Sequence, residues 1–139
     1  MPLSVAAMLG FAVGVAVGMS FFHPKDLHSA SIYGNLAAVR LIVTSSAQEP
    51  PVLDRALRIS AGLGRLDIAK LLVEHGASDM DGALRHAAVQ NQVSIVRWLV
   101  APERSPPATD LARAIRCAGN SGAADAEFFL LTIQRHYVD

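Results

Sequence analysis

Residues 57–77, LRISAGLGRLDIAKLLVEHGA, predict two short helices joined by a tight turn at Gly64. Glycine tolerates the positive φ angle that such a turn often needs. Ser60 is small, so it lets the first helix pack closely on its neighbours. The apolar run in the second helix is more than one such unit can bury, and the unit therefore predicts neighbours of its own kind.

The same pattern recurs, so the chain contains four units, which start at positions 27, 57, 84 and 115. The turn position holds Gly34, Gly64, Asn91 or Gly122, and the position four residues earlier holds Ala30, Ser60, Ala87 or Ala118. Stacking the units buries their apolar runs against one another. The sequence therefore predicts an all-α protein with a short helical solenoid.

These units resemble ankyrin repeats over residues 25–131. The family pattern of leucine, histidine and alanines, then glycine, a Val-x-x-Leu-Leu helix and Gly-Ala, is followed in order. The Thr-Pro pair is absent, the family histidine remains only as His28, and the units are shorter than the ~33 residues typical of the family. We therefore expect a helical stack without long protruding β-turns. The resemblance implies a non-catalytic recognition module whose partner the fold does not identify.

Residues 3–22 contain no formal charge and predict a membrane-spanning helix, because twenty helical residues extend ~30 Å, about the thickness of a bilayer's hydrocarbon core. Small residues at four-residue intervals would share one face of this helix: Ala6, Gly10, Gly14 and Gly18. The backbone of a second helix can approach closely there, which predicts helix pairing. A signal peptide is disfavoured because its apolar core is only ~7–15 residues long. A helix buried in a soluble assembly remains the alternative.

The sequence thus predicts two parts, residues 1–24 as the transmembrane helix and residues 25–139 as four ankyrin-like repeats. So few residues separate them that we expect the first repeat to rest at the membrane surface. The basic residues that follow the apolar segment favour the cytosolic, matrix or stromal side for the repeats.

The composition argues against several classes of function. The 12 basic and 12 acidic side chains leave a net charge near zero, which gives no general reason to expect a nucleic acid partner. The single cysteine, Cys117, cannot form an internal disulfide, and the 5 histidines lack the spacing of a metal site. Neither a phosphate-binding loop nor a nucleophile elbow is present in the sequence. We expect no catalytic residue, metal, cofactor or small-molecule substrate.

Alignment of the units places basic residues in two columns. The first column contains Lys25, Arg55 and Arg113, and the second contains His28, Arg58, Arg85 and Arg116. Equivalent positions stack along a solenoid, so we expect these side chains to form one row, which we call the basic ladder. Positive charge near a helix N-terminus opposes the helix dipole at a cost of about 0.3–1 kcal/mol per exposed site. The basic ladder would contact acidic lipid headgroups or an acidic strip on a partner.

The alternative is a solvated face whose charges neutralise one another. Asp54 precedes Arg58 by four residues, and Asp81 precedes Arg85 by four, which is the favourable order for an ion pair within one helix. Asp54 and Asp81 also lie where an N-cap residue is expected. The sequence leaves both interpretations open.

Aromatic residues near the C-terminus fall in two different columns. Trp98 belongs to a column of large apolar residues that we expect to face the interior, with Leu41, Leu71 and Phe129. Phe128 belongs to a column that is otherwise basic, with Arg40, Lys70 and Arg97. Because a terminal repeat normally presents a polar outer face, an exposed Phe128 indicates a docking contact or a local shift in register.

These features predict a single-pass membrane protein that serves as a non-catalytic structural or assembly subunit of a larger membrane complex. Its partners would be other membrane-protein subunits, bound through the glycine face and the repeats, together with the lipid bilayer. By analogy with small single-span subunits of respiratory and photosynthetic assemblies, we expect an energy-transducing organelle membrane, with the mitochondrial inner membrane favoured. An autonomous membrane-tethered adaptor that recruits a soluble protein is the alternative.

Overall fold

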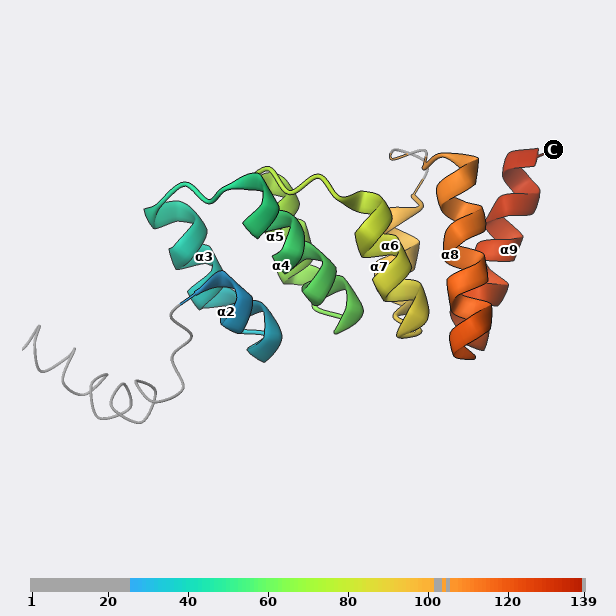
Figure 1. Cartoon of the computed structure of the whole chain (residues 1–139), viewed down its shortest axis with the longest axis horizontal. Helices are drawn as coiled ribbons and strands as arrows, with labels where there is room; N and C mark the ends of the chain where they lie inside the picture. Colours follow the sequence, from blue (N-terminus) through green and yellow to red (C-terminus); the bar gives the residue numbers. More distant parts are fainter. Residues whose placement is uncertain (1–25, 102–103, 105, 139) are drawn as a thin grey trace, which may run out of the picture.

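The computed structural model describes residues 26–101, 104 and 106–138. Every regular element in these residues is an α-helix. Consecutive helices form antiparallel pairs that stack side by side in one row, from α2 and α3 at one end to α8 and α9 at the other (Figure 1). The prediction of an all-α solenoid is confirmed for this part of the chain.

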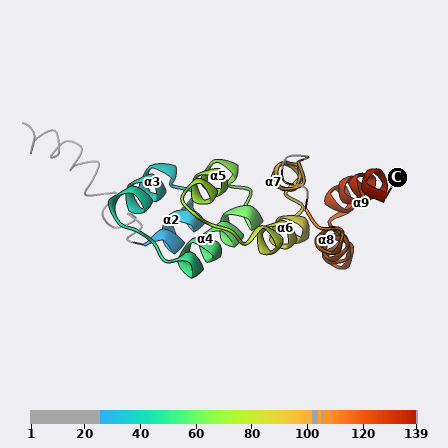
Figure 2. The ribbon, with the colours of Figure 1, turned by 90° about the horizontal axis from the view of Figure 1, so that it is seen from above.

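The first helix of each pair is α2 (Leu27–Tyr33), α4 (Pro50–Gly62), α6 (Met80–Val89) or α8 (Ala108–Ser121). The second helix of each pair is α3 (Leu36–Ser45), α5 (Leu66–Glu74), α7 (Val93–Leu99) or α9 (Ala124–Val138). Seen from above, the first helices form one layer and the second helices form the other (Figure 2). Side chains of one kind on equivalent helices therefore line up along the row.

The turns inside the pairs lie where the repeat pattern predicts them. The φ angles there are 70° at Gly34, 76° at Gly64, 58° at Asn91 and 78° at Gly122. Residues other than glycine and asparagine are strained in this left-handed region, which explains why only these two residue types occur at the position.

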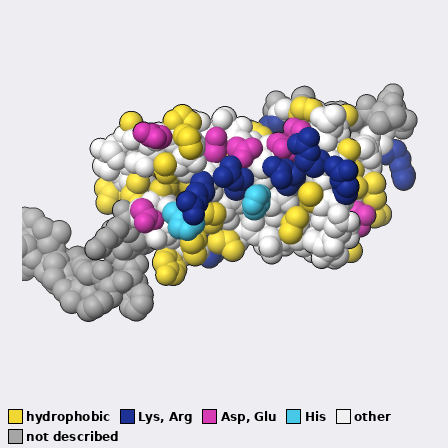
Figure 3. Space-filling model, in the orientation of Figure 1, with side chains coloured by type: hydrophobic (Ala, Val, Ile, Leu, Met, Phe, Trp, Pro, Cys, Tyr) yellow, Lys and Arg dark blue, Asp and Glu magenta, His cyan; other side chains and the backbone are white. Residues whose placement is uncertain are grey.

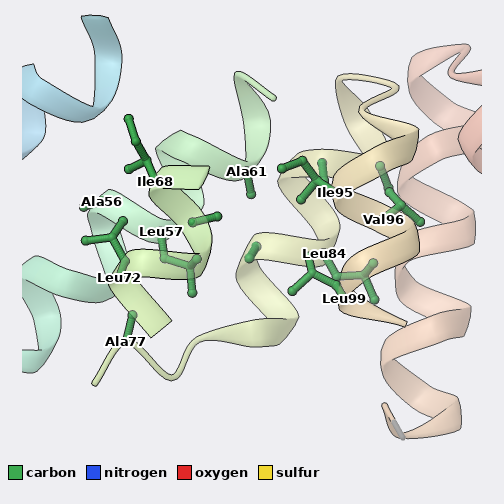
Figure 4. Close-up of a cluster of buried hydrophobic side chains, with 14 of the residues drawn as sticks. Ala56, Leu57, Ala61, Ile68, Leu72, Ala77, Leu84, Ile95, Val96 and Leu99 are labelled. Atoms are coloured by element: carbon green, nitrogen blue, oxygen red, sulfur yellow. The ribbon is translucent and has the colours of Figure 1, made fainter. Parts of the chain in front are cut away.

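A single apolar core runs through the whole stack. The small residues of the predicted packing column are all fully buried: Ala30, Ser60, Ala87 and Ala118. Larger side chains fill the space between the two layers, where Leu57 and Leu72 of the second pair and Leu84 and Leu99 of the third are buried (Figure 4). Because each pair shares this core with its neighbours, the pairs stabilise one another.

Three of the first helices, α4, α6 and α8, begin earlier than the repeat pattern indicates, whereas α2 begins at Leu27 as expected. α4 begins at Pro50, seven residues before Leu57, so Pro50 and Pro51 form the start of the helix. Proline suits the first turn because the N–H groups there have no partner within the helix. Pro107 likewise occupies the N-cap position of α8. The connection between Glu74 and Met80 is short, as the shortened repeats predict.

The ends of the stack differ from its middle. Leu41, which we expected in the interior, is 59% exposed because no described repeat precedes its own, whereas the equivalent Leu71 is buried. Trp98 and Phe129, in the same column, are half-buried against the core. At the other end Phe128 is 74% exposed. The prediction that this column faces the interior is therefore wrong only for Leu41, in the first repeat.

The predicted transmembrane helix over residues 3–22 lies outside the described residues, and so does its pairing face of Ala6, Gly10, Gly14 and Gly18. Within the part of the chain that the structure describes, no helix is both long enough and apolar enough to cross a bilayer.

Candidate protein-binding face

Lys and Arg side chains form a row across the layer of the first helices (Figure 3). The arginines of the basic ladder belong to three of these helices, with Arg55 and Arg58 on α4, Arg85 on α6, and Arg113 and Arg116 on α8. Arg58 and Arg85 are partly buried, and the other three are exposed. Lys25 lies outside the described residues. The fold thus brings arginines that are far apart in the sequence onto one face.

Arg58 links the second repeat to the third. Its Nη1 donates a hydrogen bond to Oδ2 of Asp79 over 2.6 Å, and Asp79 is the N-cap residue of α6. Burial raises the pKa of the Asp79 carboxyl, but the hydrogen bonds from Arg58 and the Gly82 N–H and the nearby arginine charges outweigh it. The pKa of Asp79 therefore lies below its ordinary value.

Asp81 on α6 is shared between two arginines. Its Oδ2 lies 3.3 Å from Arg85 Nε on the same helix and 2.8 Å from Arg113 Nη1 on α8. Arg113 also lies 3.8 Å from Oδ1 of Asp110 within its own helix. The predicted Asp81–Arg85 pair is confirmed, and Arg113 extends it across the boundary between two repeats.

The predicted role of Asp54 is wrong. Its Oδ1 accepts the backbone N–H groups of Ser78, over 2.7 Å, and Asp79, over 3.1 Å, in place of pairing with Arg58. Asp54 and Asp81 both lie inside helices, so neither is an N-cap residue, and the N-caps of α4 and α6 are Glu49 and Asp79. Asp54 instead holds the segment that leads into the next repeat.

Neutralisation within the basic ladder is incomplete. The ion pairs among the described residues involve Arg58, Arg85 and Arg113, and none includes Arg55 or Arg116. The pKa of the Asp26 carboxyl is lowered mainly by the backbone N–H of Ser29, and the charge of Arg55 adds only a small part. The self-neutralised interpretation therefore holds for Arg58, Arg85 and Arg113, whereas Arg55 and Arg116 have no ion pair among the described residues. Contact of the basic ladder with a partner or with headgroups stays a prediction.

Gly82 interrupts the first column of the basic ladder for a steric reason. A Cβ atom at this position would lie 2.7 Å from Cδ of Arg58 and would also collide with Oδ2 of Asp79. A side chain here is therefore incompatible with the Arg58–Asp79 pair as it stands. The gap in the column makes room for an ion pair between repeats.

Exposed apolar side chains follow the lower ends of the first helices, next to the basic ladder (Figure 3). We call this set the apolar row: Ile32, Tyr33, Leu63 and Val89. A groove of about 290 Å³ lies beside it between α4 and α6, lined by Arg58, Ile59, Gly62, Leu63, His86 and Gln90. The repeat alignment does not reveal this groove, because its shape depends on how two helices pack.

Phe128 lies on α9, in the layer of the second helices, and so is not part of the face that carries the basic ladder. In the same layer the guanidinium of Arg97 lies 5.4 Å from the ring centre of Phe129, and that of Arg104 lies 4.4 Å from the ring centre of Trp98. These contacts cover two aromatic rings that the core leaves half-exposed, and Phe128 remains uncovered.

Asn91 has a structural role that the repeat pattern does not reveal. Its Oδ1 accepts the backbone N–H of Ala126 in α9 over 2.9 Å, so the turn of the third repeat caps a helix of the fourth. The residue that precedes α9 is Ala123, which has no side-chain acceptor. The sequence indicates this role by one difference: the third repeat has asparagine at the turn position, whereas the other repeats have glycine.

The described residues give little support for a metal site. In the described part of the chain, no three His, Cys, Asp or Glu side chains lie close enough together to hold a metal ion. A larger cavity of about 570 Å³ separates the first and second repeats and is lined by residues that include His28, Arg55 and Gln48. The layer of the first helices thus presents charged and apolar groups side by side, an arrangement suited to binding a protein.

A family model described as ankyrin repeats, three copies, matches residues 27–110, which is more than half of the chain. No curated protein matches the chain. The fourth helix pair, α8 and α9, lies mostly beyond the matched residues but has the same left-handed turn as the other pairs and the same buried alanine as the first and third. The chain therefore belongs to the ankyrin-repeat family.

Proposed function

We propose that this ankyrin-repeat protein is a non-catalytic interaction subunit that binds a partner protein through the layer of its first helices. Ankyrin repeats suggest a role in protein–protein interaction. The observation that carries the proposal is the exposed face itself, where Arg55 and Arg116 lack an ion pair among the described residues and share the layer of the first helices with the apolar row. A self-neutralised face would instead have all its charges paired, and an ordinary surface has its apolar residues scattered singly.

The proposal extends to a membrane complex. The uncharged segment of residues 3–22 would anchor the protein in a bilayer, and its face of Ala6, Gly10, Gly14 and Gly18 would pack against a helix of another subunit. The repeats would then meet their partner at the membrane surface, with acidic headgroups close to the basic ladder. An organelle inner membrane, with that of the mitochondrion favoured, is the proposed location.

The experiment is a native gel of the full chain extracted from its own membranes in a mild detergent, with a Gly14→Leu variant alongside. Leucine at position 14 blocks close helix approach but keeps the segment apolar, so this variant should stay in the membrane fraction and leave the complex. Val13→Leu is the matched control and should remain in the complex.

Two results would contradict parts of this proposal. Extraction of the wild-type chain by alkaline carbonate would show that residues 3–22 do not span the bilayer. Migration of the wild-type chain as a free species in mild detergent would favour the alternative, a tethered adaptor that recruits a soluble partner, over a subunit of a stable complex.

A further inference from the structure

We propose that the layer of the first helices recognises an acidic segment of a partner protein that inserts one large apolar side chain into the groove between α4 and α6. The carboxylates of the segment bind Arg55 and Arg58 on one side of the groove and Arg116 farther along the basic ladder. This inference rests on the proposed function and specifies the chemistry of the partner.

The groove has the size and lining of a site for one side chain. Its volume is about 290 Å³, and Ile59, Gly62 and Leu63 supply apolar surface from α4. The groove is shallow and open to solvent, so an aliphatic or aromatic side chain laid along it would contact Ile59, Gly62 and Leu63 and stay partly exposed. Gln90 and His86 form the opposite wall from α6 and offer polar contacts at the edge of the groove.

Gly62 deepens this groove although the fold does not require a glycine there. A Cβ atom at Gly62 would lie 3.6 Å from Cβ of His86 and 3.8 Å from Cγ of Gln90, which are ordinary contacts. Its φ angle is not positive, and the equivalent positions in two other repeats hold Ile32 and Val89. Alanine is also favoured over glycine in helices. The missing side chain therefore leaves space beside Leu63 that the protein itself does not fill.

The charge around the groove favours an acidic partner. Arg58 lines the groove and uses one nitrogen, Nη1, for Asp79, which leaves other guanidinium N–H groups to donate. Arg55 lies one helical turn before Arg58, on the same side of α4. The carboxylates of Asp54, Asp79 and Asp81 already accept bonds from backbone or arginine groups. With these carboxylates engaged, Arg55 and Arg116 are the arginines of the basic ladder without an ion pair among the described residues.

The spacing of the repeats sets the spacing of the acidic residues. Packed helices lie ~8–10 Å apart, and a segment in the polyproline II conformation advances ~3.1 Å per residue with three residues per turn. Carboxylates three residues apart on such a segment share one face and can therefore meet arginines on successive first helices. We expect acidic residues at every third position of the segment, with an apolar residue between them at the groove.

The test uses the full chain in detergent and a fluorescein-labelled synthetic peptide of about twelve residues, long enough to cross the face at ~3.1 Å per residue. The peptide carries glutamate at every third position and one central leucine. Two matched peptides replace all glutamates by glutamine or the leucine by serine. Fluorescence anisotropy should show binding of the first peptide, and each replacement should weaken it about tenfold or more.

Substitutions in the protein, in place of changes in the peptide, test the same contacts. Arg55→Glu, Leu63→Ser and Gly62→Ala should each weaken peptide binding about fivefold or more, a loss of about 1 kcal/mol. Gly62→Ala is the most informative, because it should not destabilise the fold. Arg40→Glu and Leu41→Ser are the controls on α3, and binding should be unchanged in both.

The proposal is wrong if the glutamine peptide or the serine peptide binds as well as the original, or if no peptide binds. It is also wrong if vesicles containing phosphatidylserine bind this face and displace the peptide, because the anionic partner is then a membrane. If photo-cross-linking from Leu63 in the same preparation still captures a partner protein, only the acidic chemistry is wrong. If it captures none, the proposed function fails as well.

Discussion

Arg58 of the second repeat holds its Nη1 2.6 Å from Oδ2 of Asp79, the residue that caps the first helix of the third repeat. The same Asp79 accepts the backbone N–H of Gly82 through its other oxygen, Oδ1, over 2.9 Å. One carboxylate therefore ends a helix and joins two repeats. Because its partner Arg58 lines the groove, the charge state of Asp79 affects both the stack and the candidate binding face.

The first prediction is a pH dependence of stability. The pKa of Asp79 is lowered in the folded protein, so its contribution is fully present above its unfolded pKa of ~3.9 and is lost as the pH falls through the folded value. Asp79→Asn keeps a capping side chain but removes the charge. We expect it to cost about 0.5–1 kcal/mol at neutral pH, a modest value because the pair is partly exposed, and nothing near pH 2.

Thermal unfolding followed by circular dichroism at several pH values measures this difference. Glu74→Gln is the control, since Glu74 is exposed and forms no ion pair in the described part of the chain. A constant gap between wild type and Asp79→Asn at every pH would refute the role of the charge.

The second prediction concerns Gly82. Gly82→Ala places a methyl group 2.7 Å from Cδ of Arg58, so the pair with Asp79 must shift. We expect a loss of about 1–2 kcal/mol in spite of the better helix propensity of alanine. Gly62→Ala is the matched control, and it should be neutral or slightly stabilising. Equal stability of the two variants in chemical denaturation would show that the pair adapts freely.

The third prediction is a stabilising substitution. The hydroxyl of Ser60 is fully buried and has no hydrogen-bond partner among the described residues, whereas the other repeats have alanine at this position. Ser60→Ala should raise the free energy of unfolding by about 1 kcal/mol, because the cost of burying an unpaired hydroxyl disappears. Ser31→Ala is the comparison and should give no gain, since Ser31 Oγ donates to the carbonyl of Leu27 over 2.8 Å. A loss of stability in Ser60→Ala would contradict this account of the packing column.

The fourth prediction separates the two roles of Asn91, whose φ angle is 58° and whose side chain caps α9. Asn91→Gly loses the cap but relieves the backbone, so we expect a change within about 0.5 kcal/mol. Asn91→Ala loses the cap and keeps the strain, and should be about 1–2 kcal/mol less stable than Asn91→Gly. Equal unfolding midpoints for the two variants would mean that the turn relaxes without cost.

The sequence pattern predicts local features of this fold better than contacts between repeats. The turn residues and the small packing column recur in every unit, so the comparison of units identifies them. The start of α4 was missed because the repeat pattern begins at Leu57, whereas the helix extends back to Pro50. Asp79 was missed as the partner of Arg58 because the two residues are 21 positions apart and meet only when the repeats stack.

The candidate site could be predicted only in part for the same reason. The columns of the basic ladder follow directly from the alignment of the units. Which arginines are neutralised depends on the positions of Asp79, Asp81 and Asp110 in the neighbouring repeats, which the sequence does not show. The groove at Gly62 arises from the packing of α4 on α6. The pairing face in residues 3–22 remains a prediction, because it lies outside the described residues.

The most direct test of the binding face is site-specific photo-cross-linking of the full chain in its native membrane. A photoreactive residue replaces Leu63, which is exposed beside the groove, or Leu41, which is exposed on the second-helix layer. We predict one strong cross-linked protein from position 63, reduced by Arg55→Glu, and none of comparable strength from position 41. Cross-linking to protein from position 41 alone, or to lipid alone from position 63, would contradict the proposal that the first helices form the binding face.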